Sequence, residues 1–442
     1  MKIVSPLPSE GNDWHTNAGA TPRERAVDSS GRKIAMVTTH GESKLKRGLG
    51  LSLLVLYGLG VTVGAGIYVL VGAAAARAGV HAPLAFLIAA GVMALSAASF
   101  AELATRIPVS AGEAAYVEAG LRSKALSLLV GLLVVVAGVI SAAAISQGAA
   151  GYIGVLVPLP PRVLVAAVVI AMGLVAAWGI KEAVGLAALM TLIEIGGLLA
   201  IVVAGFWRDP NILSDLPLAF EGLGTSAPWH GILGASLIAF FAFIGFEGMV
   251  NVVEEVKQPE RTLPLAIALT LLASSLLYIT VVWVVLRSVP ASELATSTAP
   301  VSLAYRHLTG ASPLVVSLIA IFATINGVIV QMVMSSRVIY GLSRQGVFPS
   351  VFGHVAKATH TPLLATALVV VAILVLAVAF PIDRLAETTT RVMLVVFAFV
   401  NVALFALKMR SDVPAAPFEV PIVVPAAAAL SCVGLLVADL FT

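Results

Sequence analysis

The feature that most constrains this chain is a glycine-rich stretch, residues 58–68, inside a long apolar run. The run from Gly48 to Ala76 contains no charged residue, and its 29 positions exceed the about 20 that a helix needs to cross a bilayer. Four glycines fall within nine of these positions, and each costs a helix roughly 1 kcal/mol relative to alanine. Such a helix is either packed very closely or broken, and lipid cannot satisfy the backbone groups that a break frees. We therefore predict a discontinuous membrane helix whose unwound middle faces a cavity and binds a small polar solute.

The composition is that of an all-α polytopic membrane protein. Of 442 residues, 60% are hydrophobic and 11% are charged, whereas soluble proteins carry about 25% charged residues. The single cysteine, Cys432, excludes an intrachain disulfide framework, and nothing in the sequence indicates a nucleic acid partner. We predict about 11 membrane spans, at residues 49–76, 83–105, 125–156, 161–179, 183–206, 231–255, 264–288, 313–341, 362–381, 385–408 and 420–441.

Basic residues in the predicted loops indicate the orientation. Thirteen Lys and Arg residues fall on the side of the N-terminus and six on the other side. Because cytoplasmic loops carry the excess of positive charge, we expect the N-terminus in the cytoplasm and the protein in the cytoplasmic membrane.

A second irregular span is the sixth, at Phe240–Gly248. Gly245, Glu247 and Gly248 follow three phenylalanines in mid-span, and a charge at bilayer depth usually marks a transport pathway or relay. Interrupted helices at matching places in two halves are typical of transporters built from inverted repeats. Close packing through small residues is the alternative explanation for each stretch alone.

Four segments, in order and spacing, resemble the amino acid–polyamine–organocation (APC) superfamily of permeases. They are Gly64–Ile67; Ala101–Pro108 followed by Gly112 and Tyr116; Val250–Pro264; and Ser335–Gly346 followed by Pro349. Within the superfamily the chain is similar to bacterial members of the cationic-amino-acid-transporter type. The resemblance implies a LeuT-type fold with two inverted five-helix repeats and discontinuous helices 1 and 6. It also implies alternating access and a substrate that is usually an amino acid.

This resemblance divides the chain into three parts. Residues 1–42 are polar and are expected to be a disordered cytoplasmic tail. The transporter core spans 43–410, with repeat one at about 48–207 and repeat two at about 230–410. Residues 411–442 form an accessory C-terminal span. Members commonly have twelve spans, so the eleven predicted here are a departure.

The expected substrate site uses backbone groups of both broken helices. Amides at the start of a half-helix suit a carboxylate, and carbonyls at the end of one suit an ammonium group. We expect the amides of Val63, Gly64, Ala65, Gly66 and Ile67 and the carbonyls of Val61, Thr62, Phe240, Phe241 and Phe243, with Ala242 and Gly245 completing the site. Ala65 stands where relatives commonly have Ser or Thr, so binding must rest on the backbone. Candidates for side-chain selectivity are Phe243, Ser141 and Asn326; Phe243 is equally expected to gate the site or simply to pack.

Glu194 is the most informative departure from the superfamily pattern. It lies in mid-span, at a place where similar proton-coupled members have a lysine. A carboxylate there can carry a proton, or it can ligate sodium together with Ser335 or Ser336 and helix 1 carbonyls. Two other interpretations are that Glu194 contacts a basic side chain of the substrate or that it forms a purely structural pair.

Further acidic residues are expected to hold or gate the cytoplasmic face. Glu102, Glu254 and Glu255 lie at span ends, near basic residues such as Arg106, Lys257 and Arg261. Gln345 and Glu247 replace the aspartates that are usual in the superfamily, and Glu247 is grouped with the gating or structural residues. The histidines show no metal-ligand spacing, so neither a metal nor a cofactor is expected.

The function predicted from these features is secondary active transport of an amino acid, in symport with a proton or sodium ion. An uncoupled amino acid or polyamine exchanger is the alternative, followed by a membrane sensor that does not transport. The intramembrane acids Glu194 and Glu247 mildly favour a cationic solute. An enzyme is not expected, because the spans contain no nucleotide motif, metal set or nucleophile–base pair, and a phosphate loop is also absent.

Overall fold

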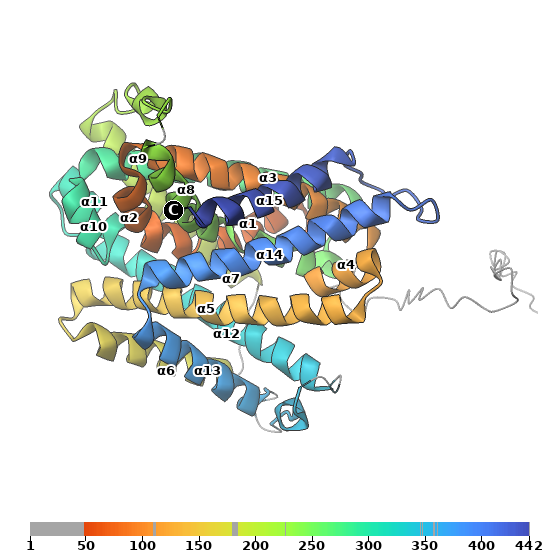
Figure 1. Cartoon of the computed structure of the whole chain (residues 1–442). Coiled ribbons are helices and arrows are strands. Elements are labelled where there is room, and N and C mark those ends of the chain that lie inside the picture. The colour runs from red at the N-terminus through yellow and green to blue at the C-terminus, as the bar shows by residue number, and fades with distance from the viewer. Residues whose placement is uncertain are drawn as a thin grey trace, which may run out of the picture. The chain divides into compact units, whose positions relative to one another are not determined.

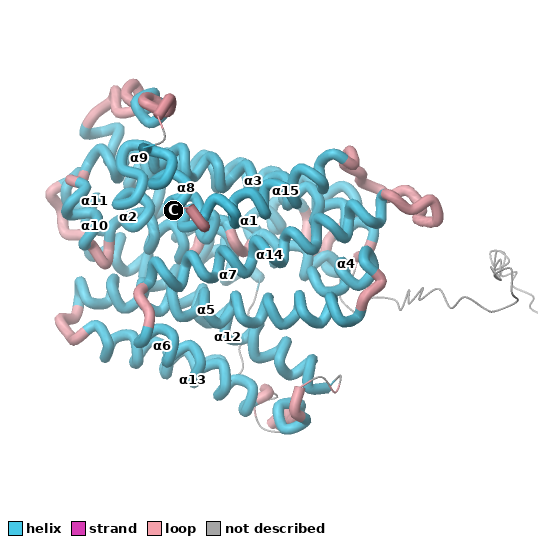
Figure 2. Tube along the Cα trace, viewed as in Figure 1, coloured by secondary structure: helices cyan, strands magenta, loops and turns pink. Residues whose placement is uncertain are grey.

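A computed structural model describes residues 48–108, 112–178, 184–225, 227–344, 346, 348–356, 359 and 361–441. The predicted tail, residues 1–42, and Gln345 lie outside the described residues. Within them the fold contains helices and no strand (Figures 1 and 2), apart from an isolated parallel bridge between Leu49 and Val256. The all-α class predicted from composition is confirmed.

The α-helices are α1 Leu51–Thr62, α2 Ala65–Ala78, α3 Ala82–Arg106, α4 Gly112–Leu121, α5 Lys124–Leu156, α6 Pro161–Trp178, α7 Val184–Arg208, α8 Ala227–Phe243, α9 Pro259–Ser288, α10 Ala291–Thr296, α11 Pro300–Thr309, α12 Leu314–Arg344, α13 Leu363–Ala379, α14 Ile382–Lys408 and α15 Val423–Asp439. The 3₁₀ helices are η1 Gly79–His81, η2 Leu216–Phe220, η3 Phe246–Glu255 and η4 Ser350–Gly353.

Eight helical stretches within the described residues are long and apolar enough to cross a membrane. Three shorter apolar helices, α1, α13 and α15, also fall within predicted spans. The exact number of spans, eleven by sequence, stays a prediction.

Both predicted helix breaks are confirmed. In the first span α1 ends at Thr62 and α2 begins at Ala65, so two residues interrupt the helix in the glycine-rich stretch. In the sixth span α8 ends at Phe243, and the chain resumes at Phe246 as the tighter 3₁₀ helix η3.

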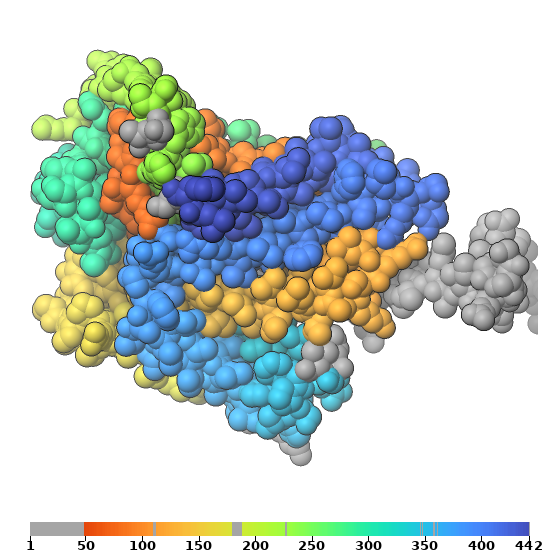
Figure 3. All heavy atoms as spheres, in the orientation of Figure 1, coloured from red at the N-terminus to blue at the C-terminus, as the bar shows by residue number. Residues whose placement is uncertain are grey.

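The two broken helices pack against each other and against the helices that follow them. α2 lies on α8, and α1 contacts α7, α9 and η3. α5 packs along α12 and α14 (Figure 1). α15 contacts α14 and α3, and the space-filling view shows α15 on the surface (Figure 3). The breaks are therefore enclosed by protein, as the loss of helical hydrogen bonds within a membrane requires.

At Gly66, α2 approaches α8 closely. A Cβ atom at this position would lie 2.6 Å from the Cα atom of Ala242, a backbone atom that cannot swing aside. We predict that Gly66→Ala lowers the stability of the purified protein by about 1–3 kcal/mol, as overpacking of a core does.

The measurement is thermal unfolding in detergent. The matched control is Gly91→Ala in α3, because nothing lies within 4 Å of a Cβ atom there and the position faces outward. Equal melting temperatures for the two variants would contradict the close approach.

Candidate functional site

At the first break, the end of α1 and the start of α2 lack the backbone hydrogen bonds that a continuous helix would make. The Val63 amide still donates to the Leu59 carbonyl at 2.6 Å, which closes the last turn of α1. The chain then turns at Gly64, and the amides of Gly64, Ala65, Gly66 and Ile67 form the start of α2. These four amides, a narrower set than the one predicted, are the groups that suit an anion.

The second break depends on a glycine. Gly245 has φ of +131°, a conformation that other residues rarely adopt, and a Cβ atom there would lie 2.1 Å from the carbonyl oxygen of Val61. Its amide donates to Oε2 of Glu247 at 2.8 Å. Glu247 therefore caps the break in its own helix, which agrees with the structural part of its predicted role.

Tyr278 of α9 joins the two breaks. Its hydroxyl oxygen lies 2.7 Å from the carbonyl oxygen of Thr62 and 3.0 Å from that of Ala242. Tyr278 is not among the residues predicted from the sequence. The sequence does contain a signal for it. Thr270, Ser274 and Tyr278 are four residues apart and form a polar stripe on an otherwise apolar helix.

Both breaks line one cavity of about 730 Å³, within the range of small-molecule sites. Helices α4, α5, α12 and α14 and the 3₁₀ helix η3 also contribute to its wall. Eight of the predicted substrate-site residues line it: Val61, Thr62, Gly64, Ala65, Gly66, Phe241, Ala242 and Gly245. The selectivity candidates Ser141 and Asn326 line it too. The wall also includes polar residues that were not predicted from the sequence: Glu113, Asn251, Gln331, Arg337 and Thr389.

Four predicted residues lie outside this wall: Val63, Ile67, Phe240 and Phe243. Phe243 is fully buried, with its ring centroid 5.0 Å from that of Tyr278 and 6.4 Å from that of Phe86. Phe240 packs against Phe397 at 5.9 Å. For Phe243 the geometry favours the packing alternative over the gate and the selectivity contact.

Glu194 is buried in α7, behind α1, and is not among the cavity-lining residues. Its Oε2 atom has no hydrogen-bond partner within the described residues, and its backbone carbonyl accepts a 2.5 Å hydrogen bond from the Tyr68 hydroxyl. One turn earlier, Oγ1 of Thr191 lies 2.1 Å from where a Cβ atom of Gly60 would be. Glu194 is therefore carried on a helix that touches α1 just before the break.

The two serines proposed to act with Glu194 point elsewhere. Oγ of Ser335 lies 2.7 Å from where a Cβ atom of Gly138 in α5 would be, and it has no partner within the described residues. Oγ of Ser336 donates to the Val333 carbonyl at 3.0 Å. Among the described contacts, none joins either serine to Glu194.

Three predicted gating residues lie where η3 leads into α9. The Glu255 carbonyl accepts the amides of Gly48 and Leu49, both at 3.0 Å, which ties the start of the described chain to this end of η3. Glu254 is half-buried on η3, and Arg261 is exposed in the first turn of α9.

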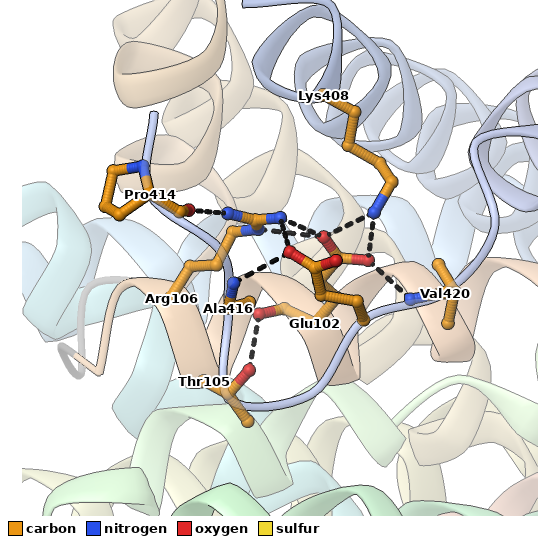
Figure 4. Close-up of polar contacts among 8 residues, drawn as sticks. Glu102, Thr105, Arg106, Lys408, Pro414, Ala416 and Val420 are labelled. Atoms are coloured by element: carbon orange, nitrogen blue, oxygen red, sulfur yellow. Dashed lines mark hydrogen bonds and ion pairs between the residues drawn. The ribbon is translucent and has the colours of Figure 1, made fainter. Parts of the chain in front are cut away.

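Glu102 lies at the centre of a polar cluster at the same end of the bundle (Figure 4). Its buried carboxylate accepts hydrogen bonds from Arg106, from Lys408 of α14 and from the Val420 amide, all at 2.8–2.9 Å. Arg106 also pairs with Glu419 at 2.8 Å. Pairing with Arg106 was predicted; Lys408, and not Lys257 or Arg261, is the second cation.

The segment between α14 and α15 is held by this cluster. The pKa of the Glu419 carboxyl is lowered, first by the hydrogen bond from the Ala416 amide and then by Lys408 and Arg106. Arg106 additionally donates to the Pro414 carbonyl at 2.7 Å. The segment is thereby fastened over the ends of α3 and α14.

Comparison with known proteins identifies related chains over nearly the whole length. The model of the amino acid permease family matches residues 49–441. A branched-chain amino acid permease of Bacillus subtilis is 30% identical over 91% of this chain and 90% of its own length. A vacuolar cationic amino acid transporter of Arabidopsis thaliana is 30% identical over 87% of this chain and 66% of its own length. A methylthioribose transporter of Bacillus subtilis is 27% identical over 89% of this chain and 88% of its own length.

The buried cluster generates a prediction about stability. Glu102→Ala leaves Lys408 and Arg106 without their carboxylate, and removing one partner of a buried pair costs about 3–5 kcal/mol. The control is Asp412→Ala, which breaks an exposed pair with Arg122 at the same end and is expected to cost about 0–1 kcal/mol. Chemical denaturation in detergent measures both, and a loss for Glu102→Ala as small as the control would refute the structural role.

Proposed function

The chain belongs to the amino acid permease family, and we propose that it moves an amino acid across the cytoplasmic membrane by alternating access. The observation that carries the proposal is a cavity that residues of both helix breaks line together. The family is one of transporters, and the fold is the LeuT type that the sequence resemblance implied. A helix pair broken at matching places gives a polar binding site at mid-membrane that either side can reach in turn.

The cavity extends from the breaks toward one end of the bundle. Glu113 at the start of α4, Asn251 on η3 and Arg337 near the end of α12 line it there. At the opposite end α2 is packed, with Gly72 against the Leu294 carbonyl and Arg77 paired with Glu387 of α14. With the N-terminus in the cytoplasm, as the loop charges favour, this is the arrangement of a transporter facing inward.

We propose a neutral aliphatic substrate. Between the breaks and α5, α12 and α14 the cavity wall is mainly apolar, with Ile145, Phe241, Ala323, Val330 and Met393. Glu247 lines the cavity but already receives the Gly245 amide, and Glu194 is outside the wall. This lining suits the substrate class named for the bacterial branched-chain relative better than it suits a cationic amino acid or polyamine. The sequence alone had mildly favoured a cationic solute, because of Glu194 and Glu247.

We propose that Glu194 couples transport to a proton. A buried carboxylate with one oxygen lacking a hydrogen-bond partner among the described residues is costly in its charged form, so it suits a group that is protonated and released in the cycle. Sodium is the weaker alternative, because neither Ser335 nor Ser336 is directed to Glu194 by a described contact.

The substrate proposal is tested by uptake into proteoliposomes with an inward-directed proton gradient. We predict concentrative uptake of labelled leucine, competition by valine and isoleucine, and no competition by an equal concentration of lysine or putrescine. Binding without flux would favour a sensor, and lysine uptake would contradict the neutral substrate.

The coupling proposal is tested by Glu194→Gln in the same vesicles. We predict that the variant still exchanges labelled for unlabelled leucine but no longer concentrates it in response to the proton gradient. Glu260→Gln, at an exposed acid in the first turn of α9, is the control and should behave as the unchanged protein does. Unchanged gradient-driven uptake by Glu194→Gln would remove Glu194 from the coupling mechanism.

A further inference from the structure

Tyr278 occupies an unusual place for a side chain of an unbroken helix. It is fully buried in α9, and its hydroxyl lies within hydrogen-bond distance of one carbonyl from each broken helix, Thr62 and Ala242. These residues are 216 and 36 positions away in the sequence. One phenol oxygen therefore connects the final turns of α1 and α8.

The two carbonyls need a donor from outside their own helices. In an uninterrupted helix the amide four residues further on would bond each carbonyl, and the breaks begin after Thr62 and Phe243. The phenol has a single proton, which the two carbonyls share, and a carbonyl has two acceptor sites, so at least one site on each oxygen stays available. Thr62 and Ala242 both line the cavity.

The Tyr278 ring is fixed by its packing. The ring of Phe86 in α3 lies 6.1 Å away in an edge-on arrangement, and that of Phe243 lies 5.0 Å away. The phenol therefore holds its hydroxyl in place without further loss of side-chain freedom when a ligand arrives, which is the property of a preorganised group.

We propose that Tyr278 is a positioning residue that fixes the spacing of the Thr62 and Ala242 carbonyls, which receive the ammonium group of the substrate. This inference rests on the proposed amino acid transport. Because every amino acid carries the same ammonium group, the contribution of Tyr278 is the same for every substrate, whereas the apolar wall of the cavity sets the choice of side chain.

The test compares Tyr278→Phe with Tyr152→Phe in proteoliposomes. Tyr152 in α5 is also fully buried, and its hydroxyl also donates to a backbone carbonyl, that of Tyr68, at 2.5 Å, but this carbonyl belongs to neither break. Both variants remove one hydroxyl and keep the ring. The measured quantities are kcat and KM for leucine, valine and isoleucine, and the melting temperature of each purified protein.

We expect Tyr278→Phe to raise KM about tenfold, equivalent to about 1.4 kcal/mol, the size of a strong hydrogen bond in a protein. The factor should be the same for all three substrates, with kcat changed much less, and Tyr152→Phe should leave KM unchanged at a similar loss of melting temperature.

Three results would overturn the inference. These are equal KM values for Tyr278→Phe and Tyr152→Phe, a KM increase that differs among the three substrates, and a Tyr278→Phe protein that does not fold while Tyr152→Phe does. The last would mean that the hydroxyl serves the fold and not the site. A failure of the unchanged protein to transport any amino acid would instead refute the proposed function.

Discussion

The structure depends on how backbone groups are satisfied where two membrane helices are interrupted. A membrane offers no water to unpaired amides and carbonyls, so each interruption must be enclosed by protein or face a polar cavity. Here both occur. The Tyr278 hydroxyl lies within hydrogen-bond distance of one carbonyl from each break, and Glu247 accepts the Gly245 amide, while Thr62, Gly64, Ala242 and Gly245 line one cavity. Gly64, Ala65 and Gly66, at the start of α2, line this cavity, and amides at the start of a helix suit an anion.

Among the residues that the structure describes, the ionic clusters lie at the two ends of the bundle. At one end Glu102 joins α3 to α14 and to the segment before α15. At the other, Arg391 of α14 bonds Asp439 of α15 at 2.6 Å and 2.9 Å, and Arg77 pairs with Glu387. α14 and α15 are thus fastened at both ends, and the Arg77 pair ties α2 to α14. In the middle of the bundle the broken helices pack closely at Gly66.

Sequence alone predicted the features that depend on local composition. The glycines and the Glu247 charge located both breaks to within a few residues, and the apolar runs predicted the helical class. Features that depend on distant segments were not predictable: Tyr278 meets Thr62 across 216 positions, and Lys408 meets Glu102 across 306. The direction in which each side chain of a helix points was also not predictable from the sequence. Phe241 lines the cavity, whereas its neighbours Phe240 and Phe243 pack against Phe397 and Phe86.

The central claim is that the two breaks together form one backbone-lined amino acid site. The most direct measurement is a structure of the protein determined with its best transported amino acid bound. The account predicts the carboxylate at the amides of Gly64–Ile67, the ammonium group beside the Thr62 and Ala242 carbonyls, and the side chain toward Ser141 and Asn326. A ligand bound instead at the Glu113 and Arg337 end of the cavity, with the breaks unoccupied, would contradict it.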